Sequence, residues 1–70
     1  MKEFLGKYVY ITIQKPEKVM QHKCAKVTTI TNTHISLFDT FDNNPYCYRK
    51  CDVIEIKLSN KSPGGIEYGN

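Results

Sequence analysis

The chain has 70 residues, enough for one small domain whose core leaves little room for an enclosed active-site pocket. Hydrophobic residues make up 40% of it and charged residues 24%, which is typical of folded globular chains rather than disordered ones. The net charge of +3 is mildly basic and does not indicate a dedicated DNA-binding protein. The sequence has no long apolar stretch and no secretory signal after Met1, so we expect a cytoplasmic protein without membrane association.

An alternating pattern in residues 8–13 predicts the first β-strand. Val9, Ile11 and Ile13 share one face, and tyrosines and a threonine occupy the other. Pro16 cannot donate a hydrogen bond to a strand ladder, and it interrupts the pattern. Residues 14–18 are therefore predicted to form a hairpin loop.

Residues 24–31 and 35–39 predict the second and third strands. In the second, Ala25 and Val27 share a face while Ile30 is out of phase, which indicates a bulge or a sharp bend. Residues 31–34 are rich in turn-forming side chains and separate the two strands. In the third strand, Ile35 and Leu37 are predicted to point inward.

Two further strands are predicted after the turn at residues 42–45. The stretch Pro-Tyr-Cys-Tyr-Arg-Lys-Cys-Asp, residues 45–52, is the fourth, with Asp52 at a tight corner. Residues 53–58 form the fifth, in which Ile54, Ile56 and Leu58 alternate with the other side chains. Residues 59–70 are rich in Gly, Ser and Asn and predict a flexible C-terminal tail, so the domain is residues 1–58.

No segment shows the apolar spacing of an amphipathic helix, so the sequence predicts an all-β fold. Five short antiparallel strands in about fifty residues leave exposed edges if they form a flat sheet. We therefore expect a strongly bent sheet rolled into a small five-stranded SH3-like barrel.

The order of hydrophobic and polar residues resembles the Sm-like family, which includes the bacterial Sm-like RNA chaperones. The match runs as small-x-Val-x-x-Ile-x-Asn-x-x-Ile-x-Leu-x-Asp from Ala25 to Asp39, and then as Tyr-Arg-Lys-x-Asp-Val-x-x-Ile from Tyr48 to Ile56. It covers about residues 7 to 58 and implies an SH3-like barrel. Members of the family usually start with a helix, and we expect it to be missing or vestigial here, because only residues 1–6 precede the matching region.

The resemblance also implies which residues bind RNA. Asn32 and His34 match the loop that contacts bases in the family. Tyr48, Arg49 and Lys50 match the aromatic and basic segment that faces uridine or phosphate. Thr33 stands near the position where the family has an aromatic side chain that stacks on a base.

Two kinds of binding function are compatible with the residues themselves. For single-stranded RNA, Tyr8, Tyr10 or Tyr48 would offer π-faces, and phosphates would be contacted by Lys23, Lys26, Arg49 and Lys50. The alternative role of the tyrosines is simply to cover the outside of the sheet. The second function is protein recognition, in which a strand edge or the Tyr and Phe38 surface takes an extended segment or a second copy of the chain.

Catalytic and metal sites are not predicted. His22, Cys24, Cys47 and Cys51 would suffice in number for zinc, but Cys47 and Cys51 on one regular strand would be roughly 13 Å apart at ~3.3 Å per residue. Whether these four residues approach one another stays open at this point. We expect three reduced thiols, no cofactor and no enzymatic activity, since no nucleophile, base and oxyanion donor can be grouped.

Overall fold

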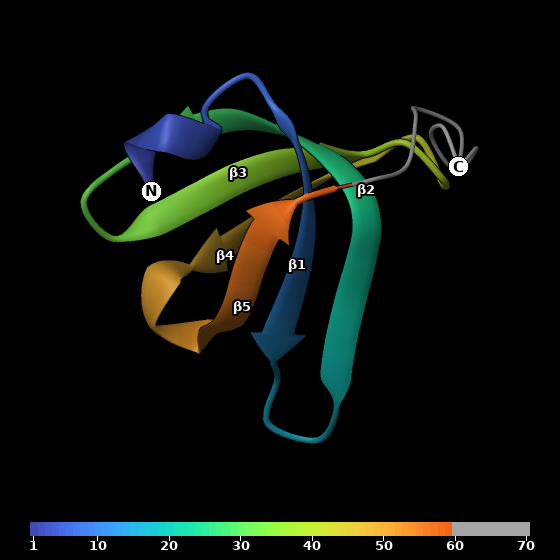
Figure 1. The fold of residues 1–70 in the computed structure, drawn as a ribbon. Coiled ribbons are helices and arrows are strands. Elements are labelled where there is room, and N and C mark those ends of the chain that lie inside the picture. Colours follow the sequence, from blue (N-terminus) through green and yellow to red (C-terminus); the bar gives the residue numbers. More distant parts are fainter. Residues whose placement is uncertain (60–70) are drawn as a thin grey trace.

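The structure, a computed structural model, describes residues 1–59, and the predicted tail beyond Ser59 lies outside the described residues. Within these residues, five antiparallel strands form one sheet in the order β4-β3-β2-β1-β5 (Figure 1). Two short 3-10 turns, η1 and η2, precede β1 and β5. The all-β class is therefore confirmed. The element bounds are η1 Lys2–Phe4, β1 Tyr8–Gln14, β2 Val19–Ile30, β3 His34–Asp39, β4 Asn44–Arg49, η2 Lys50–Asp52 and β5 Val53–Leu58.

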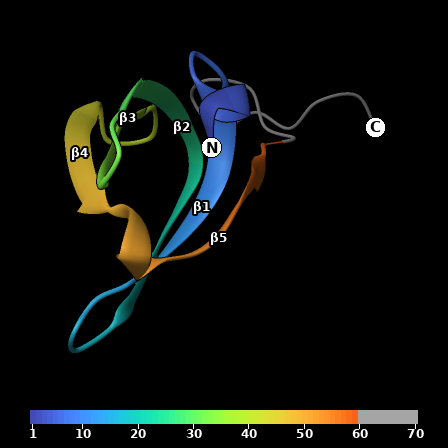
Figure 2. The same cartoon turned by 90° about the vertical axis from the view of Figure 1, so that its left-hand side faces the viewer.

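The sheet is strongly bent, because β2 curves along its 12 residues and separates β3 and β4 from β1 and β5 (Figure 2). Strand β2 contains two β-bulges. In its pairing with β1, one extra β2 residue lies between His22 and Ala25, and in its pairing with β3, Thr28 is the extra residue. Such bulges bend a strand and increase its twist. The irregularity predicted near Ile30 is therefore confirmed. The edge strands β4 and β5 are not paired with each other, so the sheet remains open between them.

The core lies on the inner face of the bent sheet. Its aliphatic part is built from alternate residues of the first three strands, as the sequence predicts, and each fully buried Val, Ile or Leu side chain contributes about 1.5–3 kcal/mol. The aliphatic side chains that are at most 1% exposed are Val9, Ile11, Ile13, Ala25, Val27, Ile35 and Leu37.

Strand β2 starts at Val19, five residues before the predicted start at Cys24, so this boundary was wrong. Val19 to His22 pair with β1, and the alternation continues through them, with Met20 and His22 inward. This part of the strand was not predicted because hydrophobic alternation identifies a strand, and the polar His22 occupies an inward position there. Lys23 is consequently a strand residue on the outer side.

Strand β4 ends at Arg49, and the prediction that it continues to Asp52 was wrong. Lys50–Asp52 turn as η2 and direct the chain into β5. In β5, Ile54 is an extra residue in the pairing with β1 and is 57% exposed, whereas Val53 pairs with Ile13 and packs on the core. The predicted apolar face of the fifth strand therefore holds for Ile56 but not for Ile54. Leu58 pairs with Val9, but it is 59% exposed.

Hydrogen bonds fix the connections between strands. The β3–β4 turn is held by two aspartates, since Asp39 Oδ1 accepts the Phe41 amide at 2.7 Å and Asp42 Oδ1 accepts the Asn44 amide at 3.0 Å. Ser59, the first residue of the predicted tail, donates its amide to the Tyr8 carbonyl at 3.0 Å.

Within residues 1–59, no helix is long and apolar enough to cross a membrane.

Candidate nucleic-acid interface

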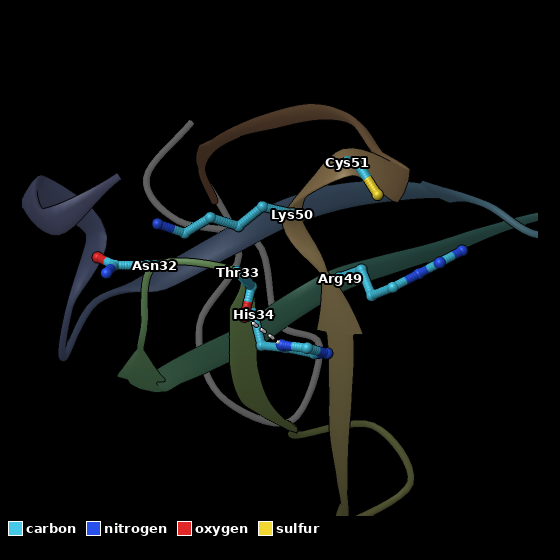
Figure 3. Close-up of a pocket in the computed structure, with 6 residues that line it drawn as sticks. All are labelled: Asn32, Thr33, His34, Arg49, Lys50 and Cys51. Atoms are coloured by element: carbon cyan, nitrogen blue, oxygen red, sulfur yellow. Dashed lines mark hydrogen bonds between the residues drawn. The ribbon is translucent and has the colours of Figure 1, made fainter.

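Two segments that are distant in sequence meet at one end of the sheet and line a surface pocket of about 510 Å³ (Figure 3). One is the β2–β3 turn with the start of β3, and the other is the end of β4 with η2. They are joined because His34 pairs with Arg49 across the two strands and the Lys50 amide donates to the Thr33 carbonyl at 2.8 Å. The lining residues are Asn32, Thr33, His34, Arg49, Lys50 and Cys51.

The pocket combines cations with groups that donate or accept hydrogen bonds. Lys50 and Arg49 supply positive charge, and Asn32 supplies an amide that can donate and accept. His34 Nδ1 and Thr33 Oγ1 are 2.7 Å apart and hydrogen-bonded, so the imidazole is oriented by its neighbour. Such a set can pair with a phosphate and with the edge of a base.

Arg49 is only partly available to a ligand. Its Nε donates to Asp52 Oδ2 at 3.2 Å and a terminal nitrogen to Oδ1 at 3.4 Å, while 65% of its side chain stays exposed. The hydrogen bond and the charge of Asp52 raise the pKa of the Arg49 guanidinium. Lys50 has no ion pair among the described residues and is the freer cation of the pocket.

No family model, curated protein or solved structure matches this chain.

The structure brings together four of the seven residues expected to bind nucleic acid, namely Asn32, His34, Arg49 and Lys50. Lys23 and Lys26 lie on β2, outside the pocket lining, and both are exposed. Tyr48 is 5% exposed and belongs to the core, so its ring has no free face for a base, contrary to the expectation.

Tyr48 is part of a buried polar network that links β2, β3 and β4. His22 Nδ1 lies 2.5 Å from Asp39 Oδ2, and His22 Nε2 lies 2.6 Å from the Tyr48 hydroxyl. With the imidazole proton on Nδ1, His22 donates to the carboxylate and accepts from the hydroxyl, so both ring nitrogens are satisfied. The three residues are 4–6% exposed, so the network holds the strands together and offers no face to a substrate.

Tyr46 extends this cluster toward the surface. Its ring stacks on Tyr48 with 6.0 Å between centroids and an interplanar angle of 7°, and its hydroxyl donates to Asp42. That hydrogen bond raises the pKa of Tyr46 to about 12 and lowers the pKa of Asp42. Burial first, and then the charges of Asp39 and Asp42, raise the pKa of Tyr48. Lys15 Nζ lies 5.2 Å from the centroid of the Tyr48 ring.

Sequence reasoning missed this network, although a signal for it was present. Asp39 continues the inward phase of Ile35 and Leu37, and a polar residue in a core phase calls for a buried partner. His22 has the matching position on β2, three residues before Ala25, which pairs with Asp39. The alternation does not show that His22 and Asp39 share a face, because the bulge between His22 and Ala25 adds one residue to the strand.

The cysteines do not assemble a metal site. Cys24 is buried, whereas Cys47 and Cys51 are exposed. The spacing expected for Cys47 and Cys51 assumed one regular strand, and the 3-10 turn at Cys51 removes that assumption. Nevertheless, the described residues contain no group of three or more His, Cys, Asp or Glu side chains placed to hold an ion.

Proposed function

We propose that the chain is a small non-catalytic module that binds single-stranded RNA in the pocket between the β2–β3 turn and η2. The supporting observation is that Asn32 and His34 share one pocket with Arg49 and Lys50, although 15 residues or more separate the two pairs in the chain. Cations beside an amide and an imidazole suit a phosphate and the exposed edge of an unpaired base.

The choice of RNA rests on the resemblance to the Sm-like family, whose base-contacting and basic segments match these residues. The pocket is open to solvent, as expected for a site that holds one unit of a longer chain. Tyr48 has no role in contacting the ligand, and Thr33 supplies a hydroxyl rather than a stacking ring.

Fluorescence anisotropy with labelled oligouridylate tests this function. Binding should weaken as salt rises, with a log–log slope of about −0.7 for each neutralised phosphate. Lys50→Gln should lower the affinity and make the slope shallower by about 0.7, because one phosphate contact is lost. Lys18→Gln in the β1–β2 turn is the control, since it removes the same charge outside the pocket.

An absence of binding to oligouridylate at low salt would refute the proposal. Equal affinities for oligouridylate and oligodeoxyuridylate would remove the preference for RNA, because the 2′-hydroxyl is what separates the two ligands chemically.

A second candidate function is protein recognition through the β5 edge, alone or as a pairing of two copies. Ile54 and Leu58 are 57% and 59% exposed there, and no strand within residues 1–59 pairs with the outer side of β5. An edge with exposed apolar side chains can take an added strand. Light scattering after size exclusion tests this alternative, and a monomer that co-purifies with no protein would leave it without support.

A further inference from the structure

The pattern of alternation places aromatic rings and lysines together on the outer face of the sheet. Tyr10 pairs with Lys57 of β5, and Lys26 of β2 lies between Tyr8 of β1 and Phe38 of β3. The strand neighbours of Tyr8, Tyr10, Lys26 and Phe38 are buried, so these four side chains project from the opposite side. Lys57 lies on that side because it pairs with Tyr10. We call this surface the outer face, and it consists of Tyr8, Tyr10, Lys23, Lys26, Phe38 and Lys57.

The outer face is open to solvent and positively charged. Its three lysines are exposed, Phe38 is 37% exposed, and the two tyrosines are half-buried. Glu55 is the acidic neighbour on β5, and it lies 4.0 Å from Lys57 Nζ. Lys23 and Lys26 carry no ion pair within residues 1–59, so their charges are available to an anionic partner.

Strand β3 connects this surface to the pocket. His34 lines the pocket, and Ser36 and Phe38 follow at alternate positions on the same side of the strand. Phe38 pairs with Lys26 of β2, which in turn pairs with Tyr8 of β1, so the three side chains form a row across the strands. An extended ligand that occupies the pocket can therefore follow β3 onto the outer face without crossing the core side of the sheet.

We propose that the outer face is a second binding surface for single-stranded RNA, which continues the path of a strand that leaves the pocket. Every base has a π-face that can stack on a tyrosine or phenylalanine, and lysines beside the rings meet the phosphates. The positive charge favours this polyanion over an uncharged apolar partner. The inference rests on the proposed function, because the ligand is the same.

The test compares uridine oligonucleotides of six and twenty units on the full chain. The variant Lys23→Gln/Lys26→Gln should bind the long oligonucleotide more weakly, and its salt slope should be shallower by about 0.7 for each of two phosphate contacts. Lys2→Gln/Lys18→Gln removes the same charge elsewhere and should behave as the wild type. Phe38→Leu keeps an apolar side chain but removes the ring, and should weaken binding of the long oligonucleotide at least about fivefold.

Each result separates the two surfaces. Unchanged binding of the long oligonucleotide by the Lys23 and Lys26 variant overturns the inference, and weaker binding by Lys50→Gln in the same assay then supports RNA binding in the pocket. If the Lys23 and Lys26 variant binds more weakly and Lys50→Gln binds normally, RNA binding on the outer face is supported and RNA binding in the pocket is refuted. If the wild type binds neither oligonucleotide, both proposals are wrong.

Photo-crosslinking supplies a readout that does not depend on charge. A 4-thiouridine oligonucleotide of twenty units should form adducts with Tyr8, Tyr10 or Phe38, located by mass spectrometry of peptides. Adducts confined to residues 32–34 and 49–51 would overturn the inference.

Discussion

The imidazole of His22 and the carboxylate of Asp39 are 2.5 Å apart in the interior of a chain of 70 residues. His22 lies in the first half of β2 and Asp39 ends β3, so the contact joins neighbouring strands. Asp39 also accepts the Phe41 amide, which ties the pair to the start of the β3–β4 turn. A buried charged group without its partner is costly, so each of the two residues depends on the other.

Replacing Asp39 with Ala should lower the free energy of unfolding by about 1–3 kcal/mol for each donor left without an acceptor, because His22 Nδ1 and the Phe41 amide both lose their partner. Urea denaturation followed by circular dichroism measures the change. Asp52→Ala, which breaks the solvent-exposed ion pair with Arg49, is the control and should have a much smaller effect. The double variant His22→Leu/Asp39→Leu should lose less stability than the sum of the losses in His22→Leu and Asp39→Leu. Strict additivity of the two losses would contradict the coupling between the residues.

Tyr48→Phe should destabilise the fold by about 1–3 kcal/mol, because the Nε2 atom of His22 is left buried without a hydrogen-bond partner. Tyr46→Phe is the matched control, since it removes a hydroxyl whose bond to Asp42 is exposed to solvent. Its midpoint in urea should move less than that of Tyr48→Phe. Equal shifts for both variants would show that burial of the hydroxyl is not what matters.

The Tyr46–Asp42 pair should contribute to stability in a defined pH range. The pKa of Tyr46 is raised from 10.0 to about 12, so its contribution is complete below pH 10 and disappears as the pH rises toward 12. The pKa of Asp42 is lowered, so its contribution is present above the ordinary value of 3.8 and is lost as the pH falls through the lowered value. NMR titration of labelled tyrosine should show the Tyr46 pKa falling toward 10.0 in Asp42→Asn. An unchanged pKa in that variant would exclude the hydrogen bond as the cause.

Asp52→Asn should strengthen binding of oligouridylate if the pocket is the RNA site. The substitution releases the Arg49 guanidinium and removes a negative charge beside the ligand. Anisotropy titrations should show a higher affinity and a steeper salt slope than the wild type. Glu17→Gln in the β1–β2 turn makes the same change in net charge away from the pocket and should have little effect. A loss of affinity in Asp52→Asn would mean that Arg49 acts only when held by Asp52.

The sequence was informative where side chains alternate without interruption. In β1 and β3, aliphatic side chains occupy every second position of the inward face, and both strands were predicted within one residue of their bounds. The start of β2 and the end of β4 were not, because a histidine occupies a core position in one and a 3-10 turn follows the other. Both features depend on contacts between distant segments, which periodicity along the chain does not contain.

For the candidate site, the sequence supplied the members of the pocket but not their surroundings. Asn32, His34, Arg49 and Lys50 came from matching segments, and the strand pairing places them together. The orientation of Tyr48 depends on the register of β4 against β3, where it lies opposite Ile35. Its inward direction follows from that pairing, which local sequence does not determine.

The position of His22 also affects how the chain avoids mispairing. If β2 paired with its neighbours one residue out of step, His22 would turn to the solvent and Lys23 would enter the interior, because successive side chains alternate between faces. Asp39 would then face an apolar environment with no imidazole N–H group to donate a hydrogen bond to it. The His22–Asp39 pair is thus satisfied in only one register of β2 against β3. It lowers the stability of a sheet in the wrong register more than an all-aliphatic core would.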